Sequence, residues 1–490
     1  MGINIEKTEF SKEDYSSFQL KLSEQLKQLK QISSCPSFGQ QELHLGAELE
    51  MYLVDAKGEV KPNNTKILKS LQDEQFQPEL NKYNIELNLS PQKLSGKPFS
   101  LLLNEIELKT NKLIEIADTE DTQIVPIGIL PTLRKEHLEH HNMTDTSRYR
   151  CLAKHLYQQR GENFQINING EDPLSIDFNN ICAEGANTSF QVHLMTKPNE
   201  LADTFNAAML TSPFVMSLSG NSPIFLGNEL WEETRIALFK QSLDIRLRDS
   251  TQWQQPTRVN FGHGWVRKNI LECFEEAVAL YPPLIPFCSS KQQKHSLPDL
   301  SELSLHLGTI WPWHRPVYSA AGNGHIRIEF RAIPAGPTNL DMVANAAFAI
   351  GLAAGFQKDI DKLLSSIPFK FAEYNFYRAA QCGLEAKILW PNKHGITVET
   401  PIKRLLPSMI LKARQGLERI GVVEEEAKYF IDIIEQRLKS EITGATWQKR
   451  TLSYLKSSAT ELNAYQKLTQ LYIENCRSNS TVTNWERKWT

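Results

Sequence analysis

Short segments of the chain alternate apolar and polar residues, and this period of two predicts β-strands with one apolar and one polar face. The clearest example is HIRIEFR at residues 325–331, where Arg327, Glu329 and Arg331 share the polar face. A solvated sheet edge laced with ion pairs would show this pattern. A polyphosphate site would show it too, because arginine donates paired hydrogen bonds to phosphate and a carboxylate can hold magnesium. Both interpretations stay open on this segment alone.

Two earlier segments place carboxylates in the same kind of pattern. Glu48 and Glu50 lie two positions apart, as do Glu86 and Asn88, so each pair shares one face of a strand. Neighbouring like charges repel each other unless a cation lies between them. We therefore expect Glu48, Glu50 and Glu86 to hold magnesium or manganese ions, and the alternative is an exposed acidic face.

A fourth amphipathic segment, residues 189–194, places Gln191 and His193 on one polar face. A single histidine more often satisfies a structural hydrogen bond than binds a metal. The shared face with Gln191 makes a metal or nucleotide ligand an equally good interpretation.

Three further arginines are candidates for binding an anion. Arg235 and Arg246 lie in segment 231–246, which has helical spacing and follows a turn-rich loop. Arg315 lies in an aromatic, strand-like stretch over 303–318. These side chains are either surface charges or ligands of a phosphate or carboxylate.

Helical spacing of apolar residues dominates the rest of the chain. We expect helices over 11–33, 98–118, 146–160, 231–246, 341–364, 369–387 and 399–478, a buried strand over 124–131, and loops with short helices over 251–300. Strands that are amphipathic rather than continuously apolar favour an antiparallel sheet. The predicted fold class is therefore α+β: a sheet with one polar functional face, flanked by helices, and a largely helical C-terminal part.

One compact domain fits this pattern, because no internal repeat or long low-complexity linker divides the 490 residues. Within it we expect an N-terminal helix packed on the catalytic domain (1–40), the catalytic sheet with its helices (41–340) and a helical C-terminal part (341–490). Residues 251–300 are the candidate lid.

Charge and cysteine content narrow the function classes. With 54 basic and 57 acidic residues the net charge is −3, so nothing attracts nucleic acid or an anionic membrane in bulk. Seven scattered cysteines without a CxxC motif indicate reduced thiols and a cytoplasmic location. We expect no signal peptide at the start of the chain, and the most apolar run, 342–356, is too short to span a bilayer.

Carboxylates for two or more magnesium ions, arginines for phosphates and one histidine together suit phosphoryl transfer from ATP. No glycine motif of the Walker or Rossmann type accompanies them. The ordered set of motifs resembles the type 2 family of glutamate–cysteine ligases, which are carboxylate–amine ligases with a glutamine synthetase-like catalytic fold. The motifs are GAELE (46–50), ELNLS (86–90), GILP (128–131), SRYR (147–150), NTSFQVH (187–193), NSP (221–223) with Gly227, ETR (233–235), Arg315 and RIEFR (327–331) followed by PAGP (334–337).

The resemblance implies a role for each candidate residue. The implied metal ligands are Glu48, Glu50, Glu86, Glu329 and His193, for two or three Mg²⁺ ions or for Mn²⁺. The implied nucleotide contacts are Arg327, Arg331, Gln191 and His193; the implied substrate contacts are Arg235, Arg315 and Arg246; and the implied catalytic residues are Arg331 and Arg235. Related enzymes carry His-x-His where this chain has Gln191-Val-His193. That departure puts the affinity or identity of the metal in question, but not the fold.

The expected reaction joins the γ-carboxylate of glutamate to an amine, with cysteine as the leading candidate, through an acyl phosphate formed from ATP. This would be a step of glutathione biosynthesis with small molecules as the partners. The same chemistry on another carboxylate or amine, phosphotransfer to a guanidino group, and a non-catalytic nucleotide-binding regulator are the alternatives. The patterns leave the oligomeric state open, and a homodimer is one option.

Overall fold

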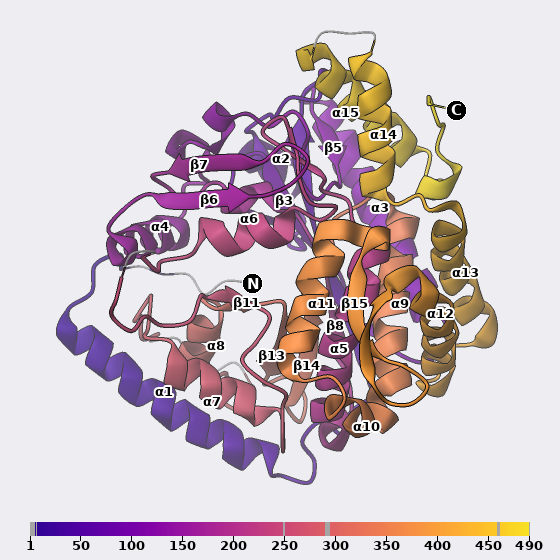
Figure 1. The fold of residues 1–490 in the computed structure, drawn as a ribbon. Helices are drawn as coiled ribbons and strands as arrows, with labels where there is room; N and C mark the ends of the chain where they lie inside the picture. Colours follow the sequence, from indigo (N-terminus) through magenta and orange to yellow (C-terminus); the bar gives the residue numbers. More distant parts are fainter. Residues whose placement is uncertain (1–4, 6, 248–249, 290–294, 458–460, 490) are drawn as a thin grey trace.

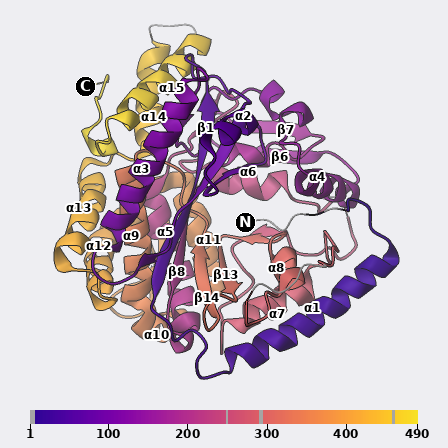
Figure 2. The ribbon, with the colours of Figure 1, turned by 180° about the vertical axis from the view of Figure 1, so that it is seen from behind.

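The computed structural model describes residues 5, 7–247, 250–289, 295–457 and 461–489. An eight-stranded antiparallel sheet runs through the centre of the described chain (Figures 1 and 2). Six strands follow the order β13-β14-β8-β1-β3-β2, and β4 and β5 pair with β1. The strands are β1 His44–Val54, β2 Phe76–Pro78, β3 Asn84–Asn88, β4 Gln92–Lys93, β5 Gln123–Val125, β8 Phe190–Met195, β13 His314–Ser319 and β14 His325–Phe330. The predicted α+β class with an antiparallel sheet is confirmed.

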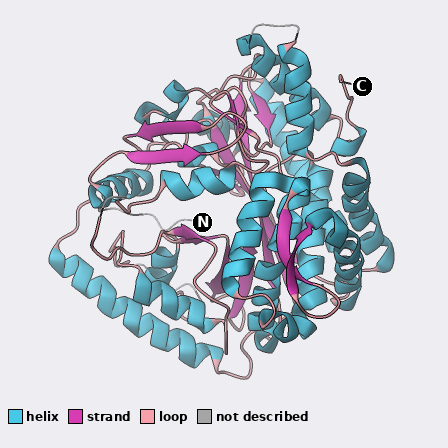
Figure 3. Cartoon of the chain, viewed as in Figure 1, coloured by secondary structure: helices cyan, strands magenta, loops and turns pink. Residues whose placement is uncertain are grey.

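Helices α5 and α9 pack against one side of this sheet, and further helices lie on its other side, where α7 contacts β13 (Figure 3). Figure 2 shows the strands between α3, α5, α9, α12 and α13 on one side and α1, α6, α7 and α8 on the other. The longer helices are α1 Lys12–Ser33, α3 Pro98–Asp118, α4 Ser147–Arg160, α5 Leu201–Ser219, α6 Arg235–Ser242, α7 Leu271–Leu280, α8 Ser301–Leu307, α9 Asn339–Phe356, α11 Phe369–Cys382, α12 Ile402–Arg419, α13 Glu424–Ser440, α14 Gly444–Lys456 and α15 Glu461–Arg477. The shorter ones are α2 Asn64–Leu71 and α10 Ile360–Leu364.

The Ala-rich helix α9 lies against α12 at very close range. A Cβ atom added at Gly416 of α12 would collide with the backbone carbonyl of Gly351 in α9, so only glycine permits this approach. The stretch Asn339–Leu364 is long and apolar enough to cross a membrane, but 78% of its most apolar window is buried inside the protein. Its apolar character is therefore explained by packing in the core.

The N-terminal helix α1 packs on α7 and α8. Its Gln25 side chain accepts a hydrogen bond from the Leu303 amide at 2.8 Å and donates one to Glu302. A buried polar contact therefore joins α1 to α8. The proposed division of the chain near residues 40 and 340 stays a prediction, as does the lid over 251–300, of which 290–294 lie outside the described residues.

Some predicted elements differ from the observed ones. The strand expected over 124–131 ends at Val125, because the prolines at 126 and 131 remove two amide donors. Residues 301–307 form helix α8 rather than a strand. Two hairpins were not predicted: β6 Phe164–Ile168 with β7 Leu174–Phe178, and β15 Lys387–Pro391 with β16 Thr397–Pro401. Both pack as small two-stranded units outside the main sheet.

A buried ion pair ties α13 to α9. Arg437, 1% exposed, donates to the carboxylate of Asp341 at 3.0 Å and to the Leu218 carbonyl at 3.2 Å. The Asp341 carboxylate also accepts a hydrogen bond from the Val482 amide at 2.9 Å. The pair therefore joins the end of α5, two core helices and the C-terminal segment.

We predict that Arg437→Ala destabilises the protein by about 3–5 kcal/mol, because it leaves the fully buried Asp341 carboxylate without its cation. Urea denaturation followed by far-UV circular dichroism measures the effect. Lys439→Ala on the same helix removes an exposed pair with Glu435 and is expected to change stability by less than about 0.5 kcal/mol. Equal losses in both variants would contradict this role for the Arg437–Asp341 pair.

Candidate active site

The strand register brings the predicted polar residues together on one face of the sheet. Glu48 on β1 lies opposite Gln191 on β8, and Glu50 lies opposite Glu86 on β3. On the other side of β8, His193 lies opposite Glu329 on β14. Side chains from four adjacent strands, separated by up to 281 positions in the chain (48 to 329), therefore form one polar surface.

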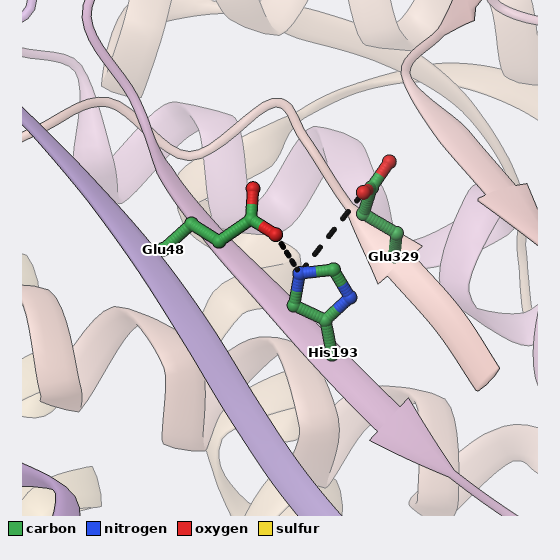
Figure 4. A group of neighbouring side chains, drawn as sticks. All are labelled: Glu48, His193 and Glu329. Atoms are coloured by element: carbon green, nitrogen blue, oxygen red, sulfur yellow. Dashed lines mark hydrogen bonds and ion pairs between the residues drawn. The ribbon is translucent and has the colours of Figure 1, made fainter. Parts of the chain in front are cut away.

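The first acidic cluster consists of Glu48, His193 and Glu329 (Figure 4). Nε2 of His193 lies 3.1 Å from the nearer oxygen of Glu48 and 4.0 Å from an oxygen of Glu329. Nε of Arg327 donates to Nδ1 of His193 at 3.1 Å, which fixes the orientation of the imidazole. The three side chains point toward a common space from three strands.

Arginines compensate the charge of this first cluster. Nε and Nη2 of Arg315 donate to the two oxygens of Glu329 at 2.5 and 3.2 Å, and Nη1 of Arg331 donates to Glu329 at 3.1 Å. Burial acts to raise the pKa of Glu329, but these two cations lower it overall. Burial also acts to raise the pKa of Glu48, but the neighbouring His193 and its hydrogen bond lower that pKa to about 2. Both carboxylates are therefore ionised at neutral pH.

The second acidic cluster consists of Glu50, Glu79 and Glu86, and each offers an oxygen within 4.8 Å of the others. Glu50 accepts hydrogen bonds from the Ser189 amide at 2.7 Å and from Nε2 of Gln191 at 2.9 Å. No arginine forms an ion pair with this cluster in the described part of the chain. Burial and the charge of Glu86 raise the pKa of Glu50 to about 7, and burial with neighbouring carboxylates raises the pKa of Glu79 well above its usual range.

Two acidic residues of this region were missed by the sequence analysis. Glu79 follows the short strand β2, and Glu184 lies in a single 3-10 turn, Glu184–Ala186, before β8. Burial and the charge of Glu50 raise the pKa of Glu184 to about 8. Neither glutamate belongs to an alternating segment, so the period-of-two pattern could not reveal them. The only local feature at Glu79 is the proline that precedes it, Pro78, which ends the strand.

Both clusters have the donor set that Mg²⁺ and Mn²⁺ prefer, namely carboxylate oxygens from rigid strands, with one imidazole in the first cluster. Burial and the proximity of the other carboxylates raise the pKa values of Glu50, Glu79 and Glu86, because ionising them together without a cation is unfavourable. A divalent ion would supply that positive charge. The residues therefore fit the metal ions that the resemblance implied, and Glu79 joins the candidate ligands Glu48, Glu50, Glu86, Glu329 and His193.

Arg331 lies between the two clusters. Its Nη1 donates to Oε1 of Gln191 at 2.5 Å as well as to Glu329, while Gln191 donates to Glu50. The amide oxygen of Gln191 is thus already bound to a guanidinium. This geometry favours a role for Gln191 in linking Glu50 to Arg331, in place of the metal ligation expected of the histidine in related enzymes.

Arg235 and Arg246 take part in none of the hydrogen bonds described above for the two clusters. Nε of Arg235 donates to Glu233 at 2.9 Å and Nη2 donates at 2.6 Å to the carbonyl of Ala332, the residue after Arg331; both contacts are buried. Arg246 pairs with Asp244 at 2.7 Å and lines two cavities of about 840 and 680 Å³. None of the carboxylates of the two clusters lines either cavity.

Comparison with known proteins relates the fold and the sequence to those of other proteins. The fold is similar to that of a glutamate–cysteine ligase from Francisella tularensis in complex with AMP, with a TM-score of 0.52, 11% sequence identity and coverage of 90% of each chain. A bifunctional glutathione synthetase from Pasteurella multocida aligns over 94% of this chain and 55% of its own, with 12% identity and a TM-score of 0.45. A search of curated protein sequences found no significant match.

The family match and the fold together define an ATP-dependent carboxylate–amine ligase with a glutamine synthetase-like fold. The model of glutamate-cysteine ligase family 2 matches residues 44–466, and the chain belongs to this family. The predicted family and enzyme class are confirmed.

We predict that Glu79→Gln weakens Mn²⁺ binding about 10- to 100-fold, because it removes an anionic oxygen from the second cluster while keeping the side-chain shape. Isothermal titration calorimetry with Mn²⁺, without nucleotide, measures the affinity. Glu74→Gln changes an exposed residue just before β2 and serves as the matched control. Unchanged affinity in Glu79→Gln would remove Glu79 from the metal site.

Proposed function

We propose that this protein joins the γ-carboxylate of glutamate to the amine of cysteine, forming γ-glutamylcysteine with release of ADP and phosphate. The observation that carries the proposal is the position of Arg331 between two carboxylate clusters on one sheet face. Family membership over residues 44–466 supports the ligase class, and the cysteine substrate follows the name of that family.

The first step forms an acyl phosphate. A γ-carboxylate oxygen of glutamate attacks the γ-phosphorus of ATP, the bond to the bridging β–γ oxygen breaks, and ADP leaves. In this scheme Arg331 and Arg327, which contact Glu329 and His193 of the first cluster, donate to phosphoryl oxygens as negative charge moves onto them. Mg²⁺ bound by the two clusters would neutralise phosphate charge and orient the nucleotide.

The second step forms the amide bond. The uncharged amine of the acceptor attacks the acyl carbon, phosphate leaves, and the amine releases its proton. The acyl phosphate must be kept from water until then. The segment over 251–300 is our candidate for that shielding. No covalent enzyme intermediate is required, so none of the seven free cysteines serves as a nucleophile in this scheme.

The other assigned roles extend this scheme. Arg315 holds Glu329 in place through Nε and Nη2, and its Nη1 donates to the Leu307 carbonyl at 3.2 Å; in this scheme a remaining N–H of the guanidinium would contact a substrate anion. Arg235 supports the backbone beside Arg331, and Arg246 offers a substrate-carboxylate contact in its cavity. We further propose a cytoplasmic location and a place in glutathione biosynthesis; a homodimer is compatible with the scheme.

Product analysis tests the reaction. With ATP, Mg²⁺ and glutamate, ADP release should depend on cysteine and yield a γ-glutamyl dipeptide. Release that depends on another amine would keep the chemistry and replace the acceptor. A phosphoguanidine product would indicate a guanidino kinase, and ATP binding without release under any acceptor would favour a regulator.

We predict that Glu48→Gln and Glu329→Gln each lower kcat by about 10³-fold or more while the protein stays folded, because each removes an anionic ligand from the first cluster. Coupled ADP-release kinetics give kcat, and circular dichroism confirms folding. Glu425→Gln, an exposed residue on α13, should keep full activity. Full activity in either cluster variant would refute the assignment of the first cluster.

A further inference from the structure

The larger of the two cavities, about 840 Å³, lies where α1 packs on α7 (Figure 1). Most of its lining is apolar, including Leu22 of α1, Ile245 and the stretch VALYPP at 278–283. Trp253 also lines it and is 82% exposed. A cavity of this size with mostly apolar walls and few polar groups is the usual form of a site for a small organic ligand.

The charge of this cavity is positive. Among the described residues of its lining, Arg246 is the only charged one. Nε and Nη2 of Arg246 donate to Asp244 at 2.9 and 2.7 Å, but Nη1 forms no hydrogen bond with any residue that the structure describes. Asp244 lines the smaller cavity and not this one. The guanidinium therefore keeps donors for a ligand.

A second arginine lies behind the cavity wall. Arg258 is 0% exposed and donates to the carbonyl of Pro282, a lining residue, at 2.7 Å and to that of Thr309 at 3.2 Å. No carboxylate pairs with it in the described part of the chain, and burial lowers its pKa to about 10. A buried cation without a counter-ion is unfavourable, so an anion in the cavity would stabilise both arginines.

We propose that this cavity binds a small carboxylate with an apolar body, as a regulatory ligand separate from the substrates. The carboxylate accepts hydrogen bonds from Arg246, and the apolar body packs on Leu22, Ile245 and Leu280. None of the glutamates of the two acidic clusters lines the cavity, so this ligand leaves the proposed places of ATP and metal free.

Three hydrogen bonds connect the cavity wall to Arg331. The hydroxyl of Tyr281, a buried lining residue, accepts from Nδ2 of Asn260 at 2.8 Å. The Asn260 carbonyl accepts from the Trp313 amide at 2.9 Å, and the Trp313 carbonyl accepts from the Arg331 amide at 3.0 Å. A ligand that shifts Tyr281 is therefore expected to shift Arg331 and to change the rate of turnover.

Calorimetry with three probes tests the chemistry of the ligand. The first, 4-phenylbutanoate, has both recognition elements; 4-phenylbutanamide lacks the charge, and acetate lacks the apolar body. We expect saturable binding of 4-phenylbutanoate to the wild-type protein and binding at least about 10-fold weaker for the other two. In Arg246→Gln, affinity for 4-phenylbutanoate should fall about 10-fold, while that for the amide stays within about two-fold.

Arg267→Gln is the matched control, because Arg267 precedes α7, is 82% exposed in its side chain and pairs with Glu272 away from the cavity lining. Its affinity for 4-phenylbutanoate should equal that of the wild type. Absence of saturable binding, unchanged affinity in Arg246→Gln, or equal losses in both arginine variants would overturn the proposal.

Initial-rate kinetics separate a regulatory site from a substrate site. Saturating 4-phenylbutanoate should change kcat at least about two-fold and leave the KM values of ATP, glutamate and cysteine within about two-fold. Tyr281→Phe should bind the probe with unchanged affinity but lose the change in kcat, because it removes the hydroxyl that binds Asn260. An unchanged kcat in the wild type, or competition with a substrate, would overturn the regulatory role, and competition would assign Arg246 to the substrate site.

The binding measurement does not depend on the ligase reaction proposed above. If the protein makes no γ-glutamyl product with any amine, saturable binding that is lost in Arg246→Gln still supports the carboxylate site. If the product forms but the probe does not bind, the proposed reaction stands and the cavity proposal fails.

Discussion

The whole catalytic face depends on the contacts of one guanidinium. Arg331 donates to Glu329 of the first acidic cluster and to Gln191, which in turn donates to Glu50 of the second. A buried arginine is stable only when its donors meet acceptors, and buried carboxylates next to one another are stable only when a cation separates them. Here Glu329 and Gln191 accept the hydrogen bonds of Arg331, and the charge of Arg331 lies between the carboxylates of the two clusters. Arg331 thereby sets the spacing of the two clusters before any ligand binds.

The position of Arg331 is secured by the chain that follows it. Arg235 binds the Ala332 carbonyl at 2.6 Å, and the Phe190 amide of β8 binds the Ile333 carbonyl at 2.9 Å. The Asn221 side chain then joins the Ala335 carbonyl, at 2.7 Å, to the hydroxyl of Tyr472 on α15 at 2.8 Å. The C-terminal helices therefore support the active site directly.

Gly336 shows how tight this segment is. Its φ is +77°, in the left-handed region, and a Cβ atom would collide with the Pro126 carbonyl and the hydroxyl of Tyr472. The PAGP sequence after β14 could be read as a turn, but its partners lie more than a hundred positions away in both directions. No local sequence pattern could have predicted these contacts.

Alternation along strands made much of the site predictable, because it reports which face a side chain occupies. Glu48, Glu50, Glu86, Glu329 and His193 were all found this way, and antiparallel pairing then brought them together. The same reasoning was blind to Glu79 and Glu184, which lie on a loop and in a single turn. Their place in the site comes from tertiary contacts, which leave no periodic signal in the sequence.

The two clusters differ in a way that bears on the order of binding. Two arginines already pair with Glu329, and His193 lies within hydrogen-bond distance of Glu48, so a metal ion there competes with these groups for the same oxygens. In the second cluster Glu50, Glu79 and Glu86 repel one another, and Glu184 adds to that charge. A divalent ion relieves repulsion in the second cluster but displaces existing ion pairs in the first. The second cluster should therefore fill without nucleotide, whereas the first gains its ion when phosphate oxygens arrive to engage the arginines that Glu329 holds.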